Sequence, residues 1–202
     1  MTDDRVVPLS HLLGASVATR LTVGQITRRL TELGYTVRHH LPEHVIADSS
    51  DQLLLDRQRA VTAPRETIPR FTPGRIGDLL DPAQPVPAGH LIAAAATTGL
   101  TIGQALRRLR EFGYTVQHRL PDELRTSHTD ARLVSTKLMR PGSWLDPGQP
   151  VPAAHLIAAM NWTGLPIDQL VRRFTELGYQ ASDVVDIPPG LGLPEGVRIR
   201  LR

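Results

Sequence analysis

The sequence predicts a mainly α-helical protein with short β-hairpins, built from three tandem units of one small fold. The first observation is a repeat: three segments align without gaps, Val7 to Tyr35, Val86 to Tyr114 and Val151 to Tyr179. The second is helical spacing of the apolar residues within each segment, and the third is an extended-looking run after each one. Self-similarity over this length indicates a repeat architecture, so we expect all three units to have the same fold.

Each unit is expected to begin with a helix that ends at a tight turn. In unit two, Pro87 stands where a helix would start, a position at which the missing N–H costs nothing. The helix should end at Gly99, and Thr101 is a suitable N-cap for the next helix. Unit one has Arg20 where the other units have the turn glycine, so its turn departs from the pattern.

The second helix of each unit has an apolar stripe and a glycine at its end. In unit two the stripe consists of Ile102, Ala105, Leu106, Leu109 and Phe112, which follow helical spacing. A glycine then follows in every unit, at Gly34, Gly113 and Gly178, and glycine accepts the left-handed conformation that commonly ends a helix.

Two extended runs are expected after the second helix. In unit two they are Tyr114 to Val116 and R-L-V-S-T-K-L, and unit one has D-Q-L-L-L-D at the place of the second run. In unit three, Val197, Ile199 and Leu201 alternate with arginines, a period of two that indicates a strand with one buried face. Helix, turn, helix and hairpin is the order of a winged helix-turn-helix.

The repeat sets the predicted domain boundaries. Unit one spans residues 1–57, a Pro-rich insertion or linker spans 58–80, unit two spans 81–145 and unit three spans 146–202. The lead-in D-P-x-Q-P-V-P precedes units two and three, and proline restricts its backbone. The predicted architecture is therefore a semi-rigid array.

Composition narrows the class of protein. The chain has 202 residues and no cysteine, which excludes disulfides and thiolate chemistry and favours a reducing, cytoplasmic location. It has neither a signal-peptide pattern nor an apolar stretch long enough to cross a membrane. A formal net charge of +3 is compatible with nucleic acid without indicating it. Lys137 is the single lysine among 23 basic residues, a bias typical of GC-rich genomes that suggests an actinobacterial source.

The units resemble a known family, the winged helix-turn-helix repeats of actinobacterial proteins, some of which are attached to Hsp90-like ATPase modules of bacterial conflict systems. The similarity lies in the lead P-V-P-x-x-H-L-I-A-A, the turn T-G-L-T-I-G-Q, the helix end R-R-L-R-E-F-G-Y and the link S-W-L-D-P. It implies the fold more firmly than an activity. No Walker-type or kinase-like glycine loop occurs in the chain, so an ATPase of such a system would be a separate chain.

The second helices could act as DNA recognition helices, because Gln and Arg can read adenine and guanine in the major groove while neighbouring arginines contact phosphate. Two strand arginines of unit three would then be wing contacts. The candidate residues are Gln25, Arg28, Arg29, Gln104, Arg107, Arg108, Arg110, Gln169, Arg172, Arg173, Arg198 and Arg200.

Two alternatives remain open. Arg107 and Glu111 are four residues apart and could pair with each other, as on any solvated helix face. The same faces could also bind a protein, in which case the chain would be an adaptor for a partner such as an ATPase. The sequence therefore leaves double-stranded DNA and a partner protein as competing targets, in a regulatory or defence system.

Catalytic and metal readings have weaker support. His11, His90 and His155 occur once per unit without a second ligand at fixed spacing, and a structural role in the first helix turn explains them better. The cluster of His39, His40 and His44 does not recur in the other units. Because the polar positions repeat from unit to unit, we expect no asymmetric active site, no cofactor, no metal and no small-molecule substrate.

Overall fold

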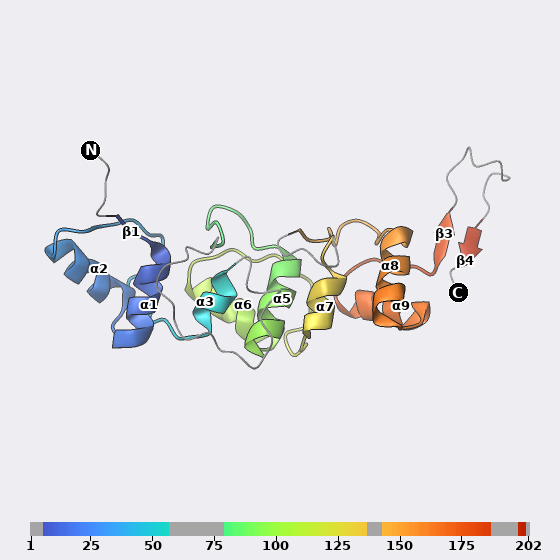
Figure 1. Cartoon of the computed structure of the whole chain (residues 1–202), viewed down its shortest axis with the longest axis horizontal. Helices are drawn as coiled ribbons and strands as arrows, with labels where there is room; N and C mark the ends of the chain where they lie inside the picture. Colours follow the sequence, from blue (N-terminus) through green and yellow to red (C-terminus); the bar gives the residue numbers. More distant parts are fainter. Residues whose placement is uncertain (1–5, 57–78, 137–142, 187–197, 201–202) are drawn as a thin grey trace.

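A computed structural model describes residues 6–56, 79–136, 143–186 and 198–200. The helical units follow one another along the long axis of the molecule, from the N-terminal helices to a C-terminal hairpin (Figure 1). The predicted boundary at residues 57 and 58 and nearly all of the predicted insertion lie outside the described residues.

Each unit contains the expected pair of helices. The pairs are α1 (Leu9–Thr19) with α2 (Val23–Glu32), α5 (Ala88–Thr98) with α6 (Ile102–Glu111), and α8 (Ala153–Thr163) with α9 (Ile167–Glu176). A proline at the N-cap precedes α1, α5 and α8. The mainly α-helical fold class is therefore confirmed.

The turns form where the sequence predicts them. Gly99 and Gly164 have φ angles of 73° and 70°, and Arg20 adopts the same left-handed conformation with φ 59°. Unit one thus keeps the turn without its glycine, although a non-glycine residue is disfavoured there. Gly34, Gly113 and Gly178 follow the second helices with positive φ angles, as predicted.

The second extended run predicted for unit one is wrong, because D-Q-L-L-L-D forms the short helix α3 (Asp51–Leu55). In unit two a short helix, α7 (His128–Leu133), includes only the first two residues of the predicted run R-L-V-S-T-K-L. Ser135 of that run forms a single antiparallel bridge with Trp144, and the last two residues lie outside the described ranges. In α7, Ser127 and Asp130 form a capping box that satisfies N–H groups of the first turn. These local caps, together with tertiary packing, override the strand-like run of apolar residues.

The expected hairpin is confirmed in unit three. Strand β3 (Val184–Asp186) pairs antiparallel with β4 (Arg198–Arg200), with Val185 opposite Ile199. Val197 and Leu201, the other members of the predicted alternation, lie outside the described residues. In unit one, β1 (Val6–Val7) pairs in parallel with β2 (Thr36–Val37), and single bridges between Val86 and Val116 and between Pro150 and Gln180 occupy the equivalent places.

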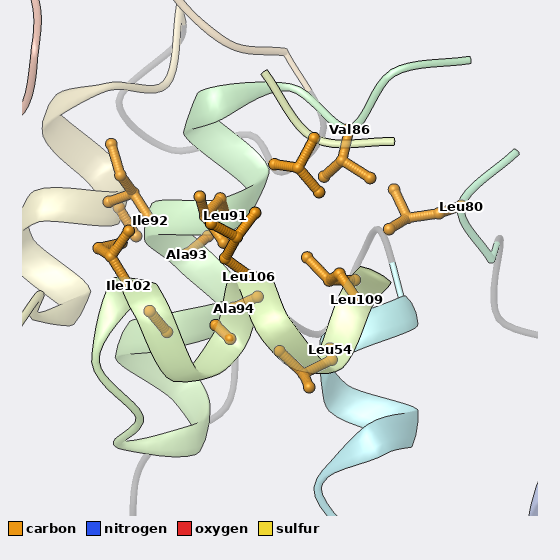
Figure 2. Close-up of a cluster of buried hydrophobic side chains, with 14 of the residues drawn as sticks. Leu54, Leu80, Val86, Leu91, Ile92, Ala93, Ala94, Ile102, Leu106 and Leu109 are labelled. Carbon is orange, nitrogen blue, oxygen red and sulfur yellow. The ribbon is translucent and has the colours of Figure 1, made fainter. Parts of the chain in front are cut away.

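The hydrophobic core runs across the unit boundaries. Figure 2 shows Leu54, from α3 of unit one, beside Leu109 of α6 in unit two, and both are fully buried. Helix α5 packs against both α3 and α7, so its alanines Ala93, Ala94 and Ala95 are completely covered. We call α3 and α7 the third helices of units one and two. Helix α3 therefore packs against the first helix of the following unit and helps complete the core of unit two, whereas α7 packs against the first helix of its own unit.

Candidate functional site, a repeated docking interface

An arginine of helix α6 holds the third helix of unit one. The Arg108 guanidinium donates from Nε to Oδ1 of Asp51 at 2.7 Å and from Nη2 to Oδ2 at 2.6 Å. Nη2 also donates to the Ile46 carbonyl at 2.8 Å, and Nη1 donates to Glu111 at 2.7 Å. The Asp51 carboxylate is fully buried, so this two-bond ion pair is sheltered from water.

The junction between units two and three repeats this geometry. Arg173 of α9 donates from Nε and Nη2 to the two carboxylate oxygens of Asp130 in α7, both at 2.7 Å. Its Nη1 donates to Glu176 at 2.6 Å, and Nη2 is 3.4 Å from the Arg125 carbonyl oxygen. In units two and three, the second of the two adjacent arginines on the second helix therefore binds the preceding unit.

Each aspartate is fixed by its own helix start. Oδ2 of Asp51 accepts from the Asp48 N–H at 2.6 Å, and Oδ2 of Asp130 accepts from the Ser127 N–H at 2.7 Å. Both segments share the pattern Asp/Ser-x-x-Asp-x-x-Leu, which ends at Leu54 and Leu133. Each carboxylate is thus also held by a backbone N–H of its own segment, independently of the arginine.

The ion pairs at the two junctions orient neighbouring units more than they increase the free energy of unfolding. Hydrogen bonding to Asp51 raises the pKa of Arg108, and hydrogen bonding to Asp130 raises the pKa of Arg173. Burial nevertheless raises the pKa of Asp51, since desolvation outweighs the opposing effect of Arg108. A buried ion pair of this kind adds little net stability but is costly to break.

A histidine of the next unit binds the end of each third helix. His90 Nε2 is 2.7 Å from the Leu54 carbonyl oxygen, and His155 Nε2 is 2.7 Å from the Leu133 carbonyl oxygen. Because a carbonyl only accepts, Nε2 carries the proton in both rings. The bonds satisfy carbonyls that a helix end leaves without intrahelical partners. His90 and His155 therefore have a structural role, as predicted, but their partner is the preceding unit, and the third repeated histidine, His11, is exposed.

The tyrosine after each second helix completes the junction. The Tyr114 hydroxyl lies 3.2 Å from the Leu80 carbonyl oxygen and 3.0 Å from His40 Nε2 of unit one. Burial lowers the pKa of His40, as does neighbouring His39, while Asp81 opposes both. At the second junction Tyr179 is buried, no described residue forms a hydrogen bond with its hydroxyl, and burial raises the pKa of this hydroxyl.

Replacing His90 by alanine should lower the free energy of unfolding by about 2 kcal/mol, because it leaves the buried Leu54 carbonyl without a donor. The matched control is His11→Ala, since His11 occupies the same repeat position but is exposed. That variant should stay within about 0.5 kcal/mol of the parent. Urea unfolding measures both, and equal effects would contradict the assigned role of His90.

In unit one, none of the described residues covers the same face. The side chain of Arg29, equivalent to Arg108 and Arg173, is 71% exposed and pairs with Glu32 of its own helix at 2.9 Å. Leu33 is 59% exposed, whereas its equivalents Phe112 and Leu177 are 0% and 1% exposed. Tyr35 and His11 are exposed too. We call Arg29, Leu33, Tyr35 and His11 the open face.

The structure divides the predicted DNA-contacting residues into several groups. Arg108 and Arg173 bind aspartates, while Gln25 and Gln104 form capping boxes with Thr22 and Thr101. Arg29 is on the open face, and Arg198 and Arg200 lie on β4. The remaining residues are exposed: Arg28, Arg107, Arg110, Gln169 and Arg172.

Sequence reasoning missed Asp51 and Asp130, although a signal was present. The two aspartates recur at the repeat offset of 79 residues, with a leucine three residues after each and Asp48 or Ser127 three residues before. The extended run expected at D-Q-L-L-L-D and the loop expected around Asp130 both conceal the helical spacing of this pattern.

Other chemistry lacks support in the described ranges. Within them, no group of three His, Asp or Glu side chains is placed to hold a metal ion. His39 instead lies 3.0 Å from the Thr27 hydroxyl through Nε2. No described helix is both long and apolar enough to cross a membrane.

Comparison with known families identifies the fold. A family model described as wHTH-Hsp90_Na associated matches residues 2–35, 46–114 and 127–179, more than half of the chain. The chain belongs to this family. No curated protein and no solved structure gave a significant match.

The family match also groups the elements in an informative way. The segments 46–114 and 127–179 each contain an Asp-bearing helix followed by a helix pair, namely α3 with α5 and α6, and α7 with α8 and α9. In its described part, the segment 2–35 contains β1 and the helix pair α1 and α2, with no helix before the pair. The helix pair with the open face, α1 and α2, is therefore also the pair that the family model matches without a preceding Asp-bearing helix.

Proposed function

We propose that this chain is a non-enzymatic adaptor whose helix-turn-helix units bind protein. One observation carries the proposal: the second helix of the unit is used twice, at α6 and at α9, as a docking surface for another protein helix. The repeated interface combines a buried charge pair, a histidine bond and apolar side chains, the elements of a specific protein contact.

The same observation weakens DNA recognition by these helices. A recognition helix enters the major groove with its polar face free. In α6 and α9, however, Arg108 and Arg173 are directed at the preceding unit. Gln104 uses its amide oxygen to accept from the Thr101 N–H at 3.0 Å. A net charge of +3 also provides little sequence-independent attraction for DNA.

The partner class follows from the family. The family is described as associated with Hsp90_Na, and the chain itself has no phosphate-binding glycine loop. We therefore take an Hsp90-like ATPase on a separate chain, or another component of the same system, as the candidate partner in the cytoplasm.

DNA binding remains the second candidate, because one set of arginines is available. Arg28, Arg107 and Arg172 occupy equivalent, exposed positions and form no ion pair in the part of the chain that the structure describes. These three residues, with Arg110, could contact the phosphate backbone. Four such contacts would give a slope of about −3.6 in a plot of log affinity against log salt concentration.

A salt titration with a labelled duplex distinguishes the two candidates. The adaptor account expects only weak binding at low salt and none at about 200 mM salt, since few phosphates are neutralised. The parent chain is compared with one triple variant, which combines Arg28→Ala, Arg107→Ala and Arg172→Ala. Tight binding that the triple variant abolishes would replace the adaptor proposal with DNA binding.

A further inference from the structure

The open face of unit one has the same residues as the two occupied faces. Arg29, Leu33 and Tyr35 correspond to Arg108, Phe112 and Tyr114 at the first junction. They correspond to Arg173, Leu177 and Tyr179 at the second. The side chains of Arg108 and Arg173 are 23% and 28% exposed, against 71% for Arg29.

The pattern of burial extends to all the contact types of the junction. Tyr35 is 45% exposed, whereas Tyr114 and Tyr179 are each 2% exposed. His90 and His155 are 1% and 9% exposed and bind helix ends, whereas His11 is exposed. All four contact types of the junction are exposed in unit one: the arginine, the apolar side chain, the tyrosine and the histidine. Unit one therefore has a complete docking surface without an occupant in the described part of the chain.

The occupied junctions define the chemistry of the missing occupant. At each one a short helix provides a buried aspartate to the arginine and a C-terminal carbonyl to the histidine. The helix follows the pattern Asp/Ser-x-x-Asp-x-x-Leu, in which the first residue fixes the aspartate and the leucine is buried.

A second copy of the chain fits this requirement poorly. Its α3 and α7 are already bound by their own Arg108 and Arg173. The described elements after Tyr179 are the two strands of the β3–β4 hairpin, and neither is a helix. In sequence, the positions one repeat after Ser127 and Asp130 are Gly192 and Glu195, which depart from the pattern.

We infer that the open face binds an Asp-bearing helix of another protein, with the pattern Asp/Ser-x-x-Asp-x-x-Leu, as a further unit added to the N-terminal end of the array. Arg29 exchanges Glu32 for the partner's aspartate or binds both, as Arg108 binds Asp51 and Glu111. Leu33 and Tyr35 become buried, and His11 donates to the carbonyl at the end of the partner helix. This inference rests on the proposed protein-binding function and names the class of partner.

The chain itself provides the probe. A capped peptide of residues 46–56, titrated into the isotopically labelled full chain, should shift the NMR signals of Arg29 Nε–H, Leu33 and Tyr35. Because an isolated short helix is marginal, we expect a dissociation constant on the order of 1 mM. A peptide with Asp51→Asn should bind about tenfold more weakly, since it lacks the carboxylate.

Two variants of the chain form a matched pair. Arg29→Ala should abolish the shifts, whereas Arg28→Ala should preserve them, because among the described residues the equivalents of Arg28 form no ion pair across the junctions, unlike Arg108 and Arg173. In a second format, residues 46–56 are joined ahead of Met1 by a flexible linker, which raises the effective concentration to about the millimolar range. The same signals should then shift without added peptide.

Several outcomes would overturn the inference. They are unchanged Arg29, Leu33 and Tyr35 signals in both formats, equal binding of the Asp51→Asn peptide, or shifts confined to the junctions of Arg108 and Arg173. Concentration-dependent dimerisation that Arg29→Ala abolishes would assign the face to a second copy instead.

The result is independent of the duplex titration, which depends on Arg28, Arg107 and Arg172. A failed peptide titration without duplex binding removes this partner class alone. Tight duplex binding removes the proposed function, whatever the peptide does.

Discussion

Replacing Asp51 by asparagine should lower the free energy of unfolding by about 3 kcal/mol, because it leaves a guanidinium against a partner without charge. Asp51 is fully buried and receives two bonds from Arg108, at 2.7 and 2.6 Å. We also expect unit one to unfold separately from units two and three, since repeat proteins are stabilised by the contacts between neighbours. Urea unfolding followed by hydrogen exchange measures both effects.

A double-mutant cycle separates the pair from the general cost of substitution. Asp51→Asn, Arg108→Gln and the double variant should give a coupling energy above about 1 kcal/mol. Arg29→Gln is the matched control and should be nearly neutral, because its ion pair with Glu32 is exposed. Additive effects of Asp51→Asn and Arg108→Gln would show that the pair does not hold the junction.

Replacing Phe112 by alanine should cost about 3–5 kcal/mol, the usual range for removing a fully buried phenylalanine. Phe112 is 0% exposed, and its ring lies beneath the Arg108 guanidinium, 4.8 Å from centroid to Cζ. The substitution therefore removes apolar burial and the support of the ion pair together. Thermal and urea unfolding of the variant measure the loss.

The control for Phe112→Ala is Leu33→Ala at the same repeat position. Leu33 is 59% exposed, so its truncation should change stability by less than about 0.5 kcal/mol. It should nevertheless weaken binding of the 46–56 peptide, because the open face loses its apolar contact. A large loss of stability in Leu33→Ala would show that this face is already covered in solution.

The helix pairs and turns were predictable from the sequence because their signals are local. The stripe from Ile102 to Phe112 needs only helical spacing, and Gly99 and Gly113 need only the left-handed conformation. Thr101 was correctly predicted as an N-cap, since Gln104 at the third helical position completes the capping box.

The third helices and the docking interface were not predicted, because their causes are non-local. D-Q-L-L-L-D is too short for periodicity to distinguish a helix from a strand, and packing against α5 decides it. Likewise, Arg107 and Arg108 are identical neighbours in sequence. Their different roles depend on Asp51, 57 residues away from Arg108.

Repeat symmetry then made the unpaired position recognisable. Arg29 resembles any arginine on a solvated helix until Arg108 and Arg173 are seen to bind aspartates in the same way. The open face of unit one is recognised by comparing the three repeat units, because the equivalent face is occupied in units two and three and exposed in unit one.

The most direct test of the docking account is the exchange of the three equivalent arginine Nε–H protons, measured by NMR on the full chain. The account expects slow exchange for Arg108 and Arg173, fast exchange for Arg29, and slower exchange at Arg29 when the 46–56 peptide is added. Equal exchange at all three arginines, or an Arg29 signal indifferent to the peptide, would contradict it.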